Sequence, residues 1–291
     1  MDMRRKAKRE SARPGAGLGV ALVTLGVLGG CQAAARSPSD GMSPARAELL
    51  RGRQLLEQRQ YPAAQEAFEE ALAKDSHSAT ARAGLGLVRE LAGDLDGAIR
   101  QYRRAVKEAP GRSDYAVSLG NALRKRAVAS DRRDEQLEAA QRAYEHALSV
   151  EPRCVEAQIG IGLCHKARGR KEQALDAFQK AEKADPESPL PHVMMASLYQ
   201  SMRENDKALE EYRAAVRLRP NDPRLHNAMA ILNENIGLSG DGRARLARQR
   251  AAALYRKSLQ IEPNQPQVRS RLAALDHEGD ALATAGLSEN E

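Results

Sequence analysis

A pattern of small, aromatic and proline residues recurs every 34 residues along this chain of 291 residues. The period is strictest in residues 79–112, 155–188 and 189–222. Each of these segments has a small residue at its eighth place (Gly86, Gly162 and Ala196) and alanine at its twentieth (Ala98, Ala174 and Ala208). The twenty-fourth place is aromatic (Tyr102, Phe178 and Tyr212) and the twenty-seventh is again alanine (Ala105, Ala181 and Ala215). Proline stands at the thirty-second place (Pro110, Pro186 and Pro220). A unit of this length is too small to bury its own core, so the pattern predicts that successive units stack.

The composition favours helices as the building blocks. Aromatic residues make up 3% of the chain and tryptophan is absent, which argues against a sheet core, since strands are rich in aromatic and branched side chains. Alanine, leucine, arginine, glutamate and glutamine dominate the sequence, and these residues have high helix propensity. Three cysteines are too few for a conventional disulfide framework. We expect an all-α protein.

The 34-residue pattern resembles the tetratricopeptide repeat (TPR), a hairpin of two helices, A and B. The small residues at places eight and twenty let these helices approach closely, and proline ends helix B because its ring cannot continue a helix interior. The resemblance implies a right-handed superhelical solenoid of about six hairpins, with the A helices lining its concave side. The six units are expected at 45–78, 79–112, 113–154, 155–188, 189–222 and 223–265, with a capping helix at 266–278.

Three of the six units depart from the strict period. The first has Ser76 in place of the closing proline. The third and sixth are longer, and their surplus falls near 128–137 and 237–249, between helices A and B. An insertion at that turn can lengthen a loop or a helix without breaking the stack. After the capping helix, we expect residues 279–291 to form a disordered tail.

The first 30 residues are typical of a targeting segment. A basic head precedes an uncharged apolar run at 16–30, which is too short to cross a bilayer comfortably, since spanning takes about 20 residues. The run ends in Leu28-Gly29-Gly30-Cys31, which resembles the lipobox of bacterial lipoproteins. The resemblance implies a signal peptide cleaved after Gly30 and acylation of Cys31, with palmitate among its chains. It also implies a protein held at the outer membrane and facing the periplasm, because Gln32 follows the cysteine where aspartate would favour inner-membrane retention. A plain secretory signal or an N-terminal anchor helix are the alternatives.

Residues 31–44 hold the cysteine and a small, polar, proline-interrupted stretch. We expect a flexible tether with a reach of roughly 20 Å. The chain has a formal net charge of +7, but residues 1–30 carry six bases and two acids, so the remaining residues carry only +3. Their bases mostly alternate with acids, as on a solvated helix surface, and nucleic-acid binding is not expected.

The TPR resemblance implies that ligand contacts come mainly from places two, five, nine, twelve and thirteen of each A helix. In this chain those places form a partly apolar strip, and an exposed apolar strip usually marks a partner-binding surface. We therefore expect a peptide or protein partner in a groove that includes Leu49, Arg53, Leu56, Leu87, Val117, Asn121, Arg124, Ile159, Leu163, Lys166, Val193 and Asn227. The two asparagines could clamp a ligand backbone, because an amide offers both a donor and an acceptor. Alternatively, tight superhelical winding covers several of these side chains.

No reactive or metal-binding constellation stands out in the sequence. Neither a phosphate-binding loop, a metal-spaced His/Cys cluster nor a Ser/His/Asp order is visible, so we expect no enzymatic activity, cofactor, metal or small-molecule substrate. His192 and His226 share the fourth place of adjacent units and are expected to be packing residues. Cys154 and Cys164 are expected to be buried and too far apart for a disulfide. The carboxylate clamp of chaperone-binding TPR proteins is missing at its set places.

These observations predict a membrane-anchored scaffold of the cell envelope that binds a segment of another envelope protein without chemistry. Fold alone does not identify the partner. Two narrower alternatives remain open. One is a pilotin-like factor, because lipidated proteins with about six TPRs resemble the lipoproteins that assist assembly of the type IV pilus secretin. The other is a docking adaptor for cell-wall enzymes.

Overall fold

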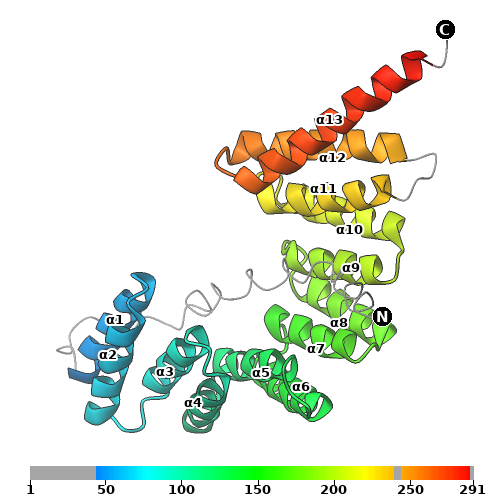
Figure 1. The fold of residues 1–291 in the computed structure, drawn as a ribbon. Coiled ribbons are helices and arrows are strands. Elements are labelled where there is room, and N and C mark those ends of the chain that lie inside the picture. Colours follow the sequence, from blue (N-terminus) through cyan, green and yellow to red (C-terminus); the bar gives the residue numbers. More distant parts are fainter. Residues whose placement is uncertain (1–43, 239–243, 289–291) are drawn as a thin grey trace, which may run out of the picture. The chain divides into compact units, whose positions relative to one another are not determined.

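The computed structural model describes residues 44–238 and 244–288, and this part of the chain contains thirteen α-helices and no strand (Figure 1). The predicted signal peptide and Cys31 lie outside the described residues. None of the described helices is both long and apolar enough to cross a bilayer. The helices are α1 (Pro44–Glu57), α2 (Tyr61–Lys74), α3 (Ala79–Leu91), α4 (Leu95–Glu108), α5 (Ser113–Ala127), α6 (Arg133–Val150), α7 (Val155–Ala167), α8 (Lys171–Ala184), α9 (Leu190–Ser201), α10 (Asn205–Leu218), α11 (Pro223–Gly237), α12 (Ala244–Ile261) and α13 (Pro266–Ser288).

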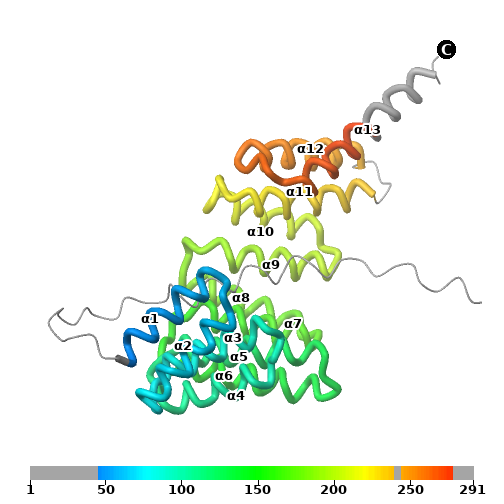
Figure 2. The backbone as a smooth tube through the Cα atoms, turned by 60° about the vertical axis from the view of Figure 1, so that its left-hand side comes forward, coloured from blue at the N-terminus to red at the C-terminus, as the bar shows by residue number. Residues whose placement is uncertain are grey.

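Consecutive helices pair as hairpins, from α1 with α2 to α11 with α12, so the odd-numbered helices up to α11 are A helices and the even-numbered ones are B helices. Each B helix also packs against the helix that follows it in the chain (Figure 2). Neighbouring A helices touch as well, among them α1 with α3, α5 with α7, and α7 with α9. The prediction of an all-α repeat solenoid is confirmed.

Each B helix of the six hairpins buries one aromatic ring among alanines. The six rings are at most 5% exposed, and the alanines at their sides are almost all fully buried. All the described buried apolar residues lie between Ala64 and Val268, within the compact unit that begins at Pro44, so this unit contains its own core. The rings belong to Phe68, Tyr102, Tyr144, Phe178, Tyr212 and Tyr255.

The Tyr144 ring shows why small residues recur. It lies between Gly120 on α5 of its own hairpin and Gly160 on α7 of the next. A methyl group on Gly120 would lie 2.6 Å from the ring, and one on Gly160 would overlap it even more closely. The requirement for a small residue therefore falls at two places, the eighth of the same unit and the sixth of the next, of which the sequence pattern revealed only the first.

A three-residue turn joins helices A and B in the four hairpins without an insertion. Its middle residue is left-handed in every case, with φ of 84° at Gly93 and 73° at Gly169, and of 59° at Arg59 and 63° at Arg203. Glycine adopts this conformation without strain, whereas a side chain disfavours it. All four residues stand at the fifteenth place of their units, so the tight turn is part of the repeat.

The insertions lengthen the B helices. The B helices α6 and α12 each have 18 residues, against 14 in α2, α4, α8 and α10. At 3.6 residues per turn, the difference is about one turn. The extra turn of α6 includes part of the surplus at 128–137, and Leu137 is buried in the core at 1% exposure.

Helix α13 continues to Ser288, ten residues beyond the predicted end of the cap. Residues 279–291 are expected from the sequence to form a disordered tail, whereas the backbone is helical through most of that stretch. Alanine and leucine are frequent there and proline is absent, and the helix begun by the cap continues across Gly279 and Gly286 despite the low helix propensity of glycine.

Candidate functional site

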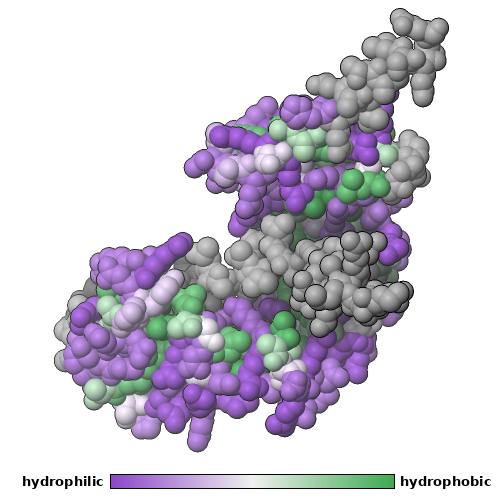
Figure 3. All heavy atoms as spheres, viewed as in Figure 1, coloured by the Kyte–Doolittle hydropathy of each residue, from purple (hydrophilic) through white to green (hydrophobic). Residues whose placement is uncertain are grey.

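The A helices α1, α3, α5, α7, α9 and α11 carry the predicted groove residues on one side, which we call the A-helix face. Figure 3 shows apolar patches separated by polar residues on the side of the molecule that it presents. Of the twelve residues predicted to line a partner groove, Arg53 is exposed and ten are half-buried: Leu49, Leu56, Leu87, Val117, Asn121, Arg124, Leu163, Lys166, Val193 and Asn227. These side chains keep part of their surface available to a partner.

Ile159 departs from that prediction. Its side chain is 4% exposed and packs in a core cluster with Phe178 and Met195. The fifth place of this A helix therefore points between the repeats rather than outward, and Ile159 contributes to stability instead of to the accessible surface.

One row of the A-helix face carries most of its polar character. The twelfth place of successive units changes from apolar to acidic, basic, amide and acidic again, and each residue is half-buried. We call this the twelfth-place row: Leu56, Glu90, Arg124, Lys166, Gln200 and Glu234. Glu90 was absent from the predicted groove, although the repeat spacing alone would have placed it there.

Tyrosine hydroxyls from the B helices tie down the polar residues of the A-helix face. Tyr102 donates to Glu90 Oε2 at 2.9 Å, and Tyr255 donates to Glu234 Oε2 at 2.8 Å. Tyr212 donates to Gln200 Oε1 at 3.1 Å. Tyr144 makes the corresponding bond one helical turn earlier, to Asn121 Oδ1, at 2.8 Å. The signal for this feature was the choice of tyrosine over phenylalanine at the aromatic place, since Phe68 and Phe178 have no hydroxyl to donate.

The two carboxylates of the twelfth-place row are paired with cations from the next repeat or the cap. Lys125 Nζ lies 2.5 Å from Glu90 Oε1, and Arg271 Nη1 lies 2.8 Å from Glu234 Oε2. These two acidic positions are therefore neutralised within the protein.

The two cations of the row lie between those positions and form no ion pair among the described residues. Lys166 Nζ donates to Ser197 Oγ at 2.8 Å and to the Ser197 carbonyl at 3.2 Å, and burial lowers its pKa below the ordinary value. The Arg124 Nε is buried without a hydrogen-bond partner. Burial raises the pKa of the Tyr144 hydroxyl, and the nearby Arg124 guanidinium partly offsets this rise. An anion from outside would stabilise both the partly desolvated ammonium of Lys166 and the half-buried guanidinium of Arg124.

The two asparagines have less freedom than the sequence suggested. Asn121 uses its oxygen to accept from Tyr144. Asn227 donates from Nδ2 to Gln265 Oε1 at 2.7 Å, while its own oxygen is buried. Each amide therefore has one of its two groups engaged inside the protein, Oδ1 in Asn121 and Nδ2 in Asn227.

The cysteines and histidines have structural surroundings. Cys154 and Cys164 are buried free thiols, as predicted, and burial raises the pKa of each to about 11. His192 Nδ1 lies 2.8 Å from Glu211 Oε2, and His226 Nε2 lies 2.8 Å from the Pro220 carbonyl oxygen. In the described part of the chain, no three His, Cys, Asp or Glu side chains are grouped to hold a metal ion.

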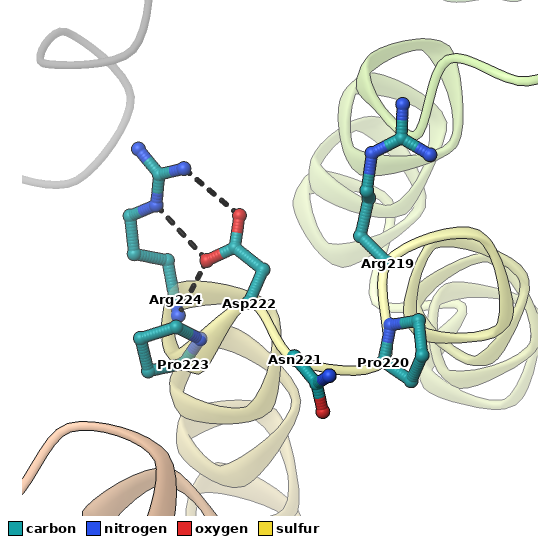
Figure 4. Close-up of a pocket in the computed structure, with 6 residues that line it drawn as sticks. All are labelled: Arg219, Pro220, Asn221, Asp222, Pro223 and Arg224. Atoms are coloured by element: carbon teal, nitrogen blue, oxygen red, sulfur yellow. Dashed lines mark hydrogen bonds and ion pairs between the residues drawn. The ribbon is translucent and has the colours of Figure 1, made fainter.

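A surface pocket at the turn between α10 and α11 is structural rather than a ligand site (Figure 4). Asp222 caps α11 by accepting from the Arg224 backbone N–H at 2.9 Å, and its two oxygens also accept from the Arg224 guanidinium at 3.0 and 2.9 Å. The rest of the pocket is lined by Arg219, Pro220, Asn221 and Pro223. The carboxylate is therefore engaged within its own loop by three hydrogen bonds from Arg224.

The comparisons with known proteins agree with this geometry. Models of the tetratricopeptide repeat match residues 49–113, 127–189 and 167–232, which together make up more than half of the chain. The chain belongs to the tetratricopeptide-repeat family. TPR proteins are scaffolds for protein–protein interaction and are typically not enzymes. None of the curated proteins compared with this chain matches it.

Several solved TPR structures share the fold. TTC0263, a thermophilic TPR protein of Thermus thermophilus, is 25% identical, with 65% of this chain and 98% of that one covered and a TM-score of 0.57. Pseudomonas aeruginosa pilF is 19% identical over 82% of this chain and 100% of its own, with a TM-score of 0.57. A TPR protein from Parabacteroides merdae is 17% identical over 80% and 85%, with a TM-score of 0.59.

Proposed function

We propose that this TPR protein is a lipid-anchored scaffold of the cell envelope that binds a peptide segment of a partner protein on its A-helix face. The observation that carries the proposal is the pair Arg124 and Lys166, two half-buried cations that form no ion pair within the described residues, on a surface that also offers apolar side chains. A peptide with acidic and aliphatic residues would supply the missing counter-charge and cover the apolar area. A partner without acidic residues would leave both cations uncompensated.

Peptide display against residues 44–291 tests the binding proposal. We expect the selected peptides to be enriched in Asp and Glu together with aliphatic residues. The variant Lys166→Gln should bind a selected acidic peptide about tenfold more weakly or worse, because a hydrogen bond to a charged group is lost. Lys183→Gln, an exposed lysine on the B helix α8, is the matched control and should bind normally. Selection of no peptides, or equal binding by both variants, would contradict the proposal.

The anchor rests on the lipobox-like Leu28-Gly29-Gly30-Cys31. Two or more acyl chains hold a protein stably at a bilayer, since each buried methylene contributes about 0.8 kcal/mol. Labelled palmitate should enter the wild-type protein in bacterial cells and should be missing from Cys31→Ser. Separation of inner and outer membranes should then place the labelled protein in the outer membrane. Equal labelling of the wild type and the variant would exclude lipidation at this residue.

A pilotin-like role in secretin assembly is the second candidate. It is supported by the number of repeats and by the likeness to Pseudomonas aeruginosa pilF along that protein's whole length, a likeness of fold at 19% identity. Deletion of the gene should then reduce secretin multimers in the host cell. Unchanged secretin multimers would exclude the pilotin-like role and leave the general scaffold as the proposed function.

A further inference from the structure

The outward side of α4 carries a row of exposed bases. Arg100, Arg103, Arg104 and Lys107 are all exposed, and their spacing of i, i+3, i+4 and i+7 places them on one side of the helix. Seven residues rise about 10 Å along a helix, so the four charges form a short straight row. We call it the α4 basic face. Within the described residues, none of the four forms an ion pair or a side-chain hydrogen bond.

The acids of α4 do not neutralise this face. Glu108 accepts from Arg82 Nε with both oxygens at 2.7 Å, and Asp96 pairs with Arg126 of α5. Both carboxylates are thus engaged by the neighbouring A helices. The α4 basic face keeps its full charge toward solvent.

Most other B helices differ in this respect. Exposed acids accompany or replace the bases on α2, α6, α8 and α10: Glu66, Glu69 and Glu70; Glu138 and Glu145; Asp176; and Glu210. Helix α12 also has exposed bases, but Arg256 there pairs with Asp276 of α13 at 2.6 Å. Its other exposed bases, Arg245, Arg250 and Lys257, do not follow the i, i+3, i+4 and i+7 spacing. The uncompensated row on α4 is therefore a local feature and does not follow from the mildly basic composition.

The chemistry of the α4 basic face suits a membrane better than a protein. The large apolar side chains exposed in the described residues lie on other elements: Leu50, Leu91, Val128, Val150, Leu238 and Leu246. Protein interfaces have an apolar core, and α4 offers nothing to form one. An array of anionic headgroups, in contrast, is attracted by charge alone. We propose that the α4 basic face binds the anionic phosphate headgroups of a lipid bilayer.

This contact goes beyond the proposed function and does not depend on it, because it needs neither the lipid at Cys31 nor a peptide on the A-helix face. Each base near an anionic surface raises the partition coefficient about fivefold. The attraction falls with ionic strength, since the screening length shortens from about 30 Å at low salt to 8 Å at physiological salt. In a tethered protein, the same contact would set the orientation of the repeats against the membrane.

Vesicle co-sedimentation of residues 44–291, the unit with its own core, tests the proposal. Vesicles of phosphatidylcholine alone are compared with vesicles that also contain phosphatidylglycerol, at low and at physiological salt. The wild type should bind the anionic vesicles at low salt and not the neutral ones. R103E/K107E should lower the partition coefficient by on the order of 30-fold or more, because two bases at about fivefold each are removed and then reversed.

The matched control is R213E/R217E. These two arginines are exposed on α10 at the same places of their repeat as Arg103 and Lys107, so the charge change, spacing and distance from the helix end are equal. The control should bind anionic vesicles nearly as well as the wild type. Equal loss in both variants, or binding to neutral vesicles, would overturn the proposal. Binding of the α4 face to soluble poly-glutamate but not to vesicles would also overturn it, in favour of an acidic protein partner.

Discussion

The hydroxyl of Tyr144 donates a 2.8 Å hydrogen bond to Oδ1 of Asn121 and thereby joins the core of the third hairpin to its accessible face. The ring of Tyr144 is fully buried between two repeats, whereas Asn121 is half-buried on the A-helix face. One side chain therefore fills the core and also orients a surface residue. The same arrangement recurs with Tyr102, Tyr212 and Tyr255.

Tyr144→Phe should lower the free energy of unfolding by about 1 kcal/mol, because one net hydrogen bond is lost while the ring packing is kept. Urea denaturation of residues 44–291 measures the change. Tyr212→Phe should cost less, since its bond to Gln200 is longer at 3.1 Å. A larger loss of unfolding free energy for Tyr212→Phe than for Tyr144→Phe would contradict this prediction. It would show that the length of the hydrogen bond does not determine how much each hydroxyl stabilises its hairpin.

Gly120→Ala should destabilise the protein by about 1–3 kcal/mol, the usual effect of overpacking a core. The new methyl group would lie 2.6 Å from the Tyr144 ring, which has no room to move away. Gly111→Ala is the control, because a methyl group there would meet nothing within 4 Å. Thermal denaturation of both variants should show a fall in midpoint for the first and little change for the second. Equal midpoints would contradict the close approach seen at Tyr144.

The two buried thiols should be unreactive in the folded protein. Burial raises the pKa of Cys154 and Cys164 to about 11, so only about one thiol in 1,000 is ionised at pH 8, and the thiolate is the reactive form. A colorimetric thiol reagent should therefore label neither cysteine of residues 44–291 in native buffer and both in denaturant. Rapid labelling of the native protein would mean that these cysteines are accessible.

Asp222→Asn should make stability less sensitive to acid. Burial raises the pKa of Asp222, but its hydrogen bonds to Arg224 outweigh that effect and hold the pKa below the ordinary value near 3.9. A carboxyl with a depressed pKa stabilises the fold above its unfolded pKa and loses this contribution as the pH falls through its folded pKa. The thermal midpoint of the wild type should therefore fall more steeply than that of the variant below about pH 4. Parallel profiles would show that Asp222 does not titrate in this way.

The sequence predicted the hairpins well because their signals are local and repeated. Alanine, glycine and an aromatic residue at fixed places reflect contacts that every repeat makes, so one pattern reveals them all. The misplacement of Ile159 has a different origin, since the family's contact places are averages and in this helix the fifth place joins the core cluster of Phe178. The ion pairs of the twelfth-place row could not be predicted from the sequence either, because Lys125 and Glu90 are 35 residues apart in the chain. Such contacts depend on how two repeats stack.

Lys166→Met should leave the protein as stable as the wild type or more stable, while weakening the binding of acidic peptides. Burial lowers the pKa of Lys166 and no carboxylate compensates its charge, so an apolar side chain removes a desolvation cost. Since the folded pKa lies below the unfolded one, the wild type should gain stability relative to the variant as the pH rises toward about 10. Lys125→Met should behave oppositely and lose about 1–3 kcal/mol, because it leaves the Glu90 carboxylate, 9% exposed, without its ammonium partner. Urea denaturation and peptide-binding measurements on both variants test this difference. Lost binding with unchanged stability would show that Lys166 serves a ligand, and lost stability would show that Lys125 serves the fold.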